Sequence, residues 1–193
     1  MRHDAFQHDL KALGNLGGIT VIDQGLGQLL ERDGRKGDLL FKGMGKNNKD
    51  LMTDITFGCA IAPSYLHNSA HIPKYVLNLL ANNKIEKYRD GYRAVGIDFE
   101  PVALEMHGQT SDFFLTLLKK LAKAAADVNN MHYSLVFNYW KIRLSTTLQR
   151  YNGKILIMAQ KKINRINNLA RDGDADVTDI IANERHVHNN CVF

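Results

Sequence analysis

An α/β fold is predicted for this 193-residue chain, with a mixed sheet flanked by helices and a helical extension toward the C-terminal end. Three strand-like runs lie before residue 58, and a helix-like pattern over 74–93 separates them from a fourth run over 97–105. Strands that follow one another directly favour antiparallel pairing, whereas a helix between two strands permits a parallel crossover. The order helix, three strands, helix, strand and further helices therefore favours one mixed sheet covered by helices.

Length and composition set the broad class of protein. A chain of 193 residues, 45% hydrophobic and 23% charged, has the composition of a globular domain and is long enough to bury a core. Its net charge of +5 is compatible with a polyanionic partner but is common in other proteins too. The two cysteines, Cys59 and Cys191, form neither a disulfide framework nor a zinc pair, which favours an intracellular location. No apolar run is long enough to span a membrane, so we expect no membrane partner.

The first half of the chain alternates short patterns with glycine-rich breaks. Phe6, Leu10 and Leu13 have helical spacing, and Gly14 follows them, which predicts a helix that ends there. The expected elements are a helix over 2–14, a strand over 19–22, a charged loop over 25–36, two strands over 37–41 and 51–57 joined by a basic loop, and an irregular segment over 59–73.

The second half is mostly helical. Pro101 lies inside the fourth strand-like run, which places that strand at an edge of the sheet or at a bulge. Ser111 is the expected N-cap of the next helix, and a longer basic helix is expected over 133–163. These patterns divide the chain into an α/β core over 1–110, a helical extension over 111–166 packed on or beside the core, and a polar, flexible tail over 167–193.

Asp38 and Asp54 are the leading candidates for a functional site. Each is a carboxylate within an apolar strand-like run, where desolvation and β propensity both disfavour it. Side by side on paired strands the two carboxylates would repel one another, and a divalent metal between them would remove that repulsion. The alternative is that both side chains simply face water on a half-buried sheet.

Several short motifs occur in an order that resembles one known family. Arg2-His3-Asp4 is similar to an Arg-His-Asp/Asn signature, and the segment over 35–40 (RKGDLL) is similar to an Arg/Lys-Pro-Asp-Leu/Val segment, with Gly37 in place of the usual proline. The segment over 54–57 (DITF) fits an Asp-Val-x-Val strand, and that over 84–88 (KIEKY) matches a Lys-x-x-Lys-Tyr helix. The chain thus resembles the restriction-like endonuclease domain, of PD-(D/E)xK type, found in reverse-transcriptase polyproteins of non-LTR retrotransposons.

The resemblance implies a function and a set of site residues. It implies a PD-(D/E)xK fold and a metal-dependent, strand-nicking DNA endonuclease of retroelement origin, with Mg²⁺ (or Mn²⁺) bound by Asp38 and Asp54. Thr56 stands where the strict motif has lysine, so the catalytic charge is assigned to Lys87 or Lys84, with Lys87 preferred because Tyr88 would anchor its turn against the sheet. A nuclear location and a retroelement RNA–protein complex as a further partner follow from the same resemblance.

Two further expectations accompany this hypothesis. The chain lacks a zinc knuckle before the Arg-His pair and lacks a polymerase, so we expect it to be a detached part of a larger element. A catalytically degenerate nucleic-acid-binding domain of the same fold is the alternative function. The basic helix that contains Lys141, Arg143 and Arg150 is a candidate DNA-binding surface, although such charges more often form a solvated helix face.

Overall fold

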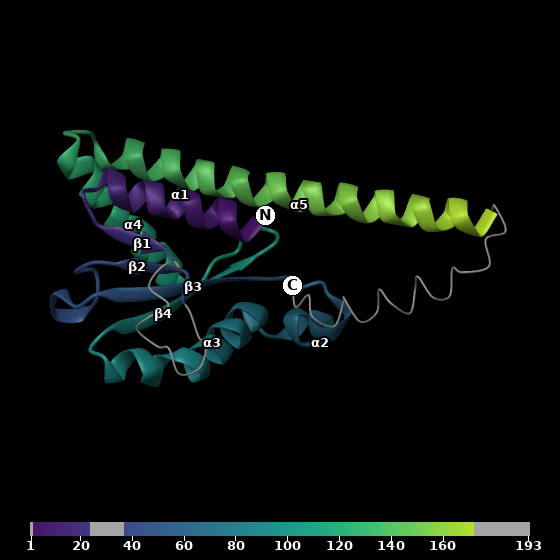
Figure 1. Ribbon diagram of the computed structural model, residues 1–193, viewed down its shortest axis with the longest axis horizontal. Coiled ribbons are helices and arrows are strands. Elements are labelled where there is room, and N and C mark those ends of the chain that lie inside the picture. Colours follow the sequence, from purple (N-terminus) through teal and green to yellow (C-terminus); the bar gives the residue numbers. More distant parts are fainter. Residues whose placement is uncertain (1, 24–36, 172–193) are drawn as a thin grey trace. The chain divides into compact units, whose positions relative to one another are not determined.

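The structure, a computed structural model, describes residues 2–23 and 37–171 (Figure 1). The elements in chain order are α1 (Arg2–Leu16), β1 (Val21–Asp23), β2 (Leu39–Phe41), η2 (Lys46–Asn48), β3 (Leu51–Gly58), α2 (Pro63–His71), α3 (Tyr75–Ala94), β4 (Asp98–Glu105), α4 (Asp112–Val128) and α5 (Tyr133–Arg171). The predicted α/β class, with a mixed sheet flanked by helices, is confirmed. The charged loop expected over 25–36 lies outside the described residues.

The four strands form one sheet in the order β1-β2-β3-β4. The first three strands pair antiparallel, and β2 is joined to β3 by the short segment that contains η2. β4 pairs parallel to β3, and α3 provides the crossover that parallel pairing requires. Pro101 lies in the edge strand β4, as predicted, where the missing N–H removes no ladder bond.

Helices cover both faces of this sheet (Figure 1). Alternate residues of β2 and β3, including Leu39, Ile55 and Phe57, join one core with α1, α4 and the beginning of α5. Residues of the opposite set, including Leu40 and Met52, join a second, smaller core with α3. Successive apolar residues of β2 and β3 therefore point alternately into the two cores, and both strands are buried.

Helices α1 and α3 begin and end close to the predicted places, whereas α5 continues to Arg171, eight residues beyond its predicted end at 163. Ser111 caps α4, because its Oγ accepts a hydrogen bond from Phe114 N at 3.3 Å. The prediction of an irregular segment over 59–73 is wrong, because α2 lies there. Pro63 is its first residue, a position where the fixed φ of proline and its missing N–H favour a helix.

The chain divides into two compact units. The first contains residues 1–149, and the predicted core boundary at residue 110 falls inside it. The second contains residues 150–193, of which the structure describes the continuation of α5 to Arg171. The polar tail predicted over 167–193 therefore lies outside the described residues except for its first five, which are helical.

An ion pair fastens α1 to the first part of α5 within the first unit. The carboxylate of Asp9 is buried, and its Oδ1 accepts hydrogen bonds from Arg143 Nε at 2.9 Å and Nη2 at 2.7 Å. Its Oδ2 accepts a third bond, from Thr147 Oγ1 at 2.6 Å. A buried carboxylate with this many donors is well compensated for its loss of water.

Candidate active site

Asp38 and Asp54 lie on neighbouring segments of the sheet. Leu39 pairs with Thr53, and Asp38 N donates to Thr53 O at 2.8 Å, which places Asp38 next to Asp54 across the ladder. Asp38 is the residue just before β2 rather than a residue within the strand, so the sequence-based assignment is wrong by one position there. The side chains of both aspartates are almost fully buried, with 6% and 4% of the residue surface exposed. The alternative that both carboxylates face water is therefore excluded.

Asp38 is fixed by two contacts to one of its oxygens. Oδ2 accepts a hydrogen bond from the backbone N–H of Ile55 at 2.5 Å. The same oxygen lies 2.8 Å from Nε2 of His3, in the first turn of α1. The hydrogen bond to Asp38, together with its negative charge, raises the pKa of the His3 imidazole against the effect of burial. These contacts hold the Asp38 carboxylate in one orientation.

Asp54 is paired with Lys84 of α3. The Lys84 ammonium nitrogen lies 2.7 Å from Asp54 Oδ2, yet the directions of approach fall outside hydrogen-bond geometry, so the contact is primarily between charges. Burial, and then the charge of Asp38, raise the pKa of the Asp54 carboxyl. Burial works against the charge of Lys84, but the contact with Asp54 outweighs it and the pKa of the ammonium is raised. Both pKa values are raised, so Asp54 and Lys84 each hold a proton more tightly in this site than in water.

The second lysine occupies a different environment. Lys87 is exposed, and its ammonium nitrogen lies 4.9 Å from the centroid of the Tyr88 ring. Tyr88 is buried, as the sequence indicated, and it anchors this turn of α3 against the sheet. The lysine that reaches Asp54 from this turn, however, is Lys84 and not Lys87. Since residues at i and i+4 share a helix face, Lys84 lies on the same side of α3 as the buried Leu80 and Tyr88. The geometry favours Lys84 over Lys87 as the lysine of the site.

Two contacts explain why position 37 is glycine and not the proline that is usual in the resembling segment. The N–H of Gly37 donates to the hydroxyl of Tyr92 at 2.8 Å, a bond that proline could not make. A Cβ at this position would lie 2.5 Å from both Cγ and Sδ of Met52. The bond from Gly37 also joins the segment before Asp38 to α3. Neither this role of Tyr92 nor that of the Ile55 N–H was visible in the sequence, which marks them only as core residues.

The three residues proposed to bind DNA do not form one basic surface in the first unit. Arg143 holds the buried Asp9 and lies over the Trp140 ring, with its Cζ 5.2 Å from the centroid. Lys141 is exposed and two residues away, so it points away from Arg143. Arg150 is exposed and begins the second unit. Arg143 thus has a structural role that its spacing alone did not predict.

The side chains of this site that could bind a metal ion are few. Among residues 2–23 and 37–171, no group of three or more histidine, cysteine, aspartate or glutamate side chains is placed to hold an ion by itself. Mg²⁺ does not need such a cage, because it is commonly bound by one or two carboxylates and completes its shell with water and substrate phosphates. Asp54 Oδ2 is buried and faces the Lys84 ammonium at 2.7 Å without a geometrically formed hydrogen bond, so an ion bound to this oxygen would share it with the ammonium or displace it. The two carboxylates therefore fit Mg²⁺ or Mn²⁺.

Comparisons with known proteins add no family. No protein-family model matches the chain, and no curated protein matches its sequence. None of the described helices is both long and apolar enough to cross a membrane.

Proposed function

We propose that this chain is a metal-dependent DNA endonuclease domain of the PD-(D/E)xK type, which nicks one strand and derives from a retroelement. The observation that supports it most is the convergence of two buried carboxylates, Asp38 and Asp54, with Lys84 at 2.7 Å from Asp54. Two carboxylates and a lysine are the parts that metal-dependent phosphodiester cleavage requires. An intracellular, nuclear location and a retroelement RNA–protein partner belong to the same proposal.

The topology agrees with this proposal. The core of that fold runs helix, three strands, helix, strand, and α1, β1, β2, β3, α3 and β4 follow this order, with α2 added before α3. The two carboxylates lie at the same end of the β2–β3 ladder. The lysine comes from α3, the helix on which the resembling branch also has its lysine. A shared topology is an argument by analogy, and the site residues carry the functional part of the proposal.

Each residue has a defined part in the proposed reaction. Bound Mg²⁺ would supply an activated water and a positive charge for the phosphorane. Asp38 and Asp54 would hold the ion, and the Ile55 N–H and His3 keep the Asp38 carboxylate oriented for it. The Lys84 ammonium, which faces Asp54, would lie beside the scissile phosphate and stabilise the negative charge that grows on its oxygens.

A plasmid-nicking assay with Mg²⁺ tests the proposal. Wild type should convert supercoiled plasmid to the open-circular form, and EDTA should stop the conversion. Asp54→Asn and Asp38→Asn keep the side-chain shape but remove a ligand charge, so both should abolish nicking while the protein stays folded. Asp50→Asn is a matched control, because Asp50 pairs with Lys42 near the surface and not with the site. Nicking that survives Asp54→Asn, or no nicking by wild type with either Mg²⁺ or Mn²⁺, would contradict the proposal.

The alternative function is a catalytically degenerate nucleic-acid-binding domain. It is favoured by one specific observation: Lys84 lies directly against Asp54, so a protein cation already compensates one of the two carboxylates. If this alternative holds, wild type binds DNA equally well in Mg²⁺ and in EDTA and cleaves it in neither.

A further inference from the structure

A second site lies at the outer edge of the sheet, away from the two aspartates. It is a pocket of about 630 Å³ beside the first residues of β4, between α3 and α4, with the η2 segment along one side. We call it the edge pocket. All of its lining residues belong to the first compact unit, and none of them is an aspartate or lysine of the candidate active site.

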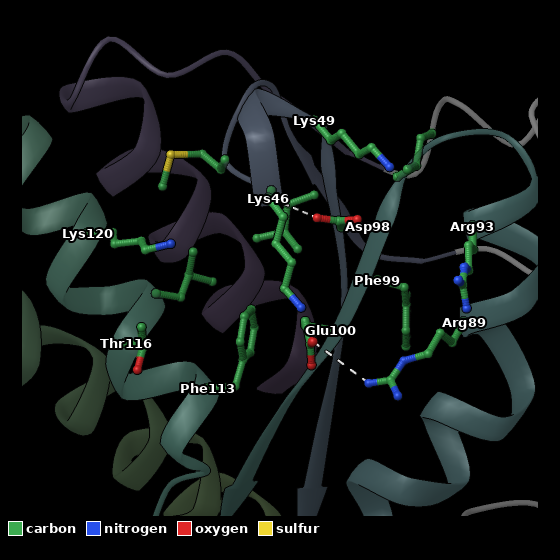
Figure 2. A pocket seen from close by; sticks show the side chains of 15 residues that line it. Lys46, Lys49, Arg89, Arg93, Asp98, Phe99, Glu100, Phe113, Thr116 and Lys120 are labelled. Carbon is green, nitrogen blue, oxygen red and sulfur yellow. Dashed lines mark hydrogen bonds and ion pairs between the residues drawn. The ribbon is translucent and has the colours of Figure 1, made fainter.

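The edge pocket is strongly basic. Its charged lining consists of five cations from three separate segments and two carboxylates; the cations are Lys46, Lys49, Arg89, Arg93 and Lys120. Figure 2 shows Lys120 extending into the pocket from α4, Arg89 and Arg93 along the opposite side, and Lys46 between them. Cations gathered in a concave surface repel one another and create a concentrated positive potential, so a polyanion bound there would relieve the repulsion.

Both carboxylates of the edge pocket have partners. Asp98 Oδ2 accepts a hydrogen bond from the backbone N–H of Lys46 at 2.6 Å, which fixes the η2 segment against β4. Glu100 Oε1 lies 3.8 Å from Arg89 Nη2, so this acid compensates one guanidinium (Figure 2). The cations that remain exceed the acids, and the pocket keeps a positive balance.

An aromatic ring lies among these cations. Phe113, the second residue of α4, is only partly buried, and its ring lines the pocket beside the Lys46 side chain (Figure 2). By contrast, the ring of Phe99 is almost fully buried and stacks on Tyr92, with their centroids 5.6 Å apart. Phe113 therefore provides the accessible aromatic face of the edge pocket, and Phe99 its floor.

The edge pocket and the candidate active site are on different sides of α3. Arg89 and Arg93 are four residues apart and share one helix face. Arg93 is nine residues from Lys84, which is about two and a half helical turns, so these two side chains project in opposite directions. A strand bound at Asp38 and Asp54 would have to pass around α3 to reach the edge pocket, so the pocket is a separate site.

We propose that the edge pocket binds a single nucleic-acid strand, with phosphates against the lysines and arginines and one base stacked on Phe113. A basic groove with an aromatic platform is the combination by which proteins bind single strands without reading their sequence. A volume of about 630 Å³ is of the size that holds a small organic ligand and far exceeds what one inorganic phosphate fills. This binding does not depend on the nicking activity.

The test is fluorescence anisotropy with a labelled single-stranded oligonucleotide in EDTA, so that cleavage plays no part. Arg93→Gln/Lys120→Gln removes two pocket cations and should weaken binding about tenfold. The slope of log affinity against log salt should fall by about 1.4, because each phosphate contact on a single strand contributes about 0.7. Phe113→Leu preserves apolar packing but removes the stacking ring, and it should weaken binding at least about fivefold.

Lys119→Gln/Lys123→Gln is the matched control, because it removes two exposed lysines of α4 that do not line the pocket. It should change affinity by less than about twofold, since neither ammonium lines the pocket and charges exposed to solvent are screened by salt. Equal weakening by the pocket and control variants, or an unchanged salt slope, would overturn the proposal. So would an unaffected Phe113→Leu variant, or a duplex of the same sequence that binds as tightly. Thermal melting of each variant identifies a folding defect, and loss of nicking in Asp54→Asn with strand binding intact separates the two sites.

Discussion

At the scale of single residues, the raised pKa of Asp54 predicts how the stability of the protein depends on pH and on a bound metal ion. A folded-state pKa above the unfolded value means that the native protein holds the proton more tightly, so this contribution to stability is lost as pH rises through the folded pKa. In EDTA the melting temperature of wild type should therefore fall relative to Asp54→Asn as the pH is raised above the ordinary titration range of aspartate. Differential scanning fluorimetry at these pH values measures the difference.

Added Mg²⁺ should reverse this trend in wild type. An ion binds the ionised carboxylate and competes with the proton, so the rise in melting temperature on adding Mg²⁺ should grow with pH. The variant Asp54→Asn should show little rise at any pH. A rise of equal size in wild type and in the variant would mean that Mg²⁺ binds elsewhere.

The two lysines of α3 are separated by a second prediction. Lys84→Ala should lower the nicking rate by about a hundredfold or more, because a charge that stabilises the transition state is lost. Lys87→Ala should change the rate by less than about threefold, since its ammonium lies over Tyr88 at the surface. Single-turnover nicking rates at saturating protein measure both, and the opposite order would restore Lys87 as the lysine of the site.

The sequence allowed the proximity of Asp38 and Asp54 to be predicted, while their role as metal ligands stays a prediction. Carboxylates beside or within apolar strand-like runs stand out because propensity and desolvation disfavour them, and the structure shows that both are buried. The choice between Lys84 and Lys87 depends on how α3 rotates against the sheet, which no local pattern determines. Hydrogen bonds such as that from Gly37 to Tyr92 join residues 55 positions apart, and such tertiary contacts leave no periodic trace in the sequence.

At the scale of elements, Gly58 at the end of β3 allows α3 to approach the sheet. A Cβ there would collide with Val76 Cγ1 and lie 2.8 Å from Leu80 Cδ1, both on the buried face of α3. Gly58→Ala should therefore lower the free energy of unfolding by about 2 kcal/mol, because overpacking displaces the helix. Gly153→Ala is the control, since a Cβ there meets nothing within 4 Å and alanine is the better helix former. Urea denaturation measures both changes, and an unchanged midpoint for Gly58→Ala would show that α3 can shift at no cost.

The ion pair between α1 and α5 makes a second prediction at this scale. Arg143→Ala removes two of the hydrogen bonds to the buried Asp9 carboxylate and leaves that from Thr147, and should cost about 2 kcal/mol, a value reduced because the arginine is partly exposed. Lys141→Ala, two residues away and exposed, should cost less than about 0.5 kcal/mol. Chemical denaturation checks both, and equal small effects would mean that the pair contributes little to stability.

The elements themselves were predictable wherever the apolar period was long and regular. Helix α4 and strand β4 lie where they were predicted, and in α4 the buried Phe114, Leu117, Leu118 and Leu121 recur at steps of three and four. Helix α2 was missed because it contains no buried residue, so its sequence shows no apolar stripe. In the sequence only Pro63 marks its beginning, and proline is as common in irregular segments as at the first position of a helix.

At the scale of the whole molecule, the division after Gln149 makes the first unit testable by truncation. The sheet, both candidate sites and the Asp9 ion pair all lie within residues 1–149. A chain ending at Gln149 should unfold cooperatively and keep the effect of Mg²⁺ on its melting temperature. Circular dichroism would show the loss of helix signal from the distal part of α5. A non-cooperative melt would mean that the second unit is required for the first to fold.

The edge strand β4 also affects how copies of the protein meet one another. An open edge offers unpaired N–H and C=O groups to any extended chain, which is a common route to aggregation. In β4 the outward Ala103 O is bonded to Ser111 N, Glu105 N is bonded to Gln109 O, and Pro101 has no N–H to offer. A neighbouring strand would find few partners along this stretch. Local features of β4 thus make this edge of the sheet resistant to the addition of a strand from another copy of the protein.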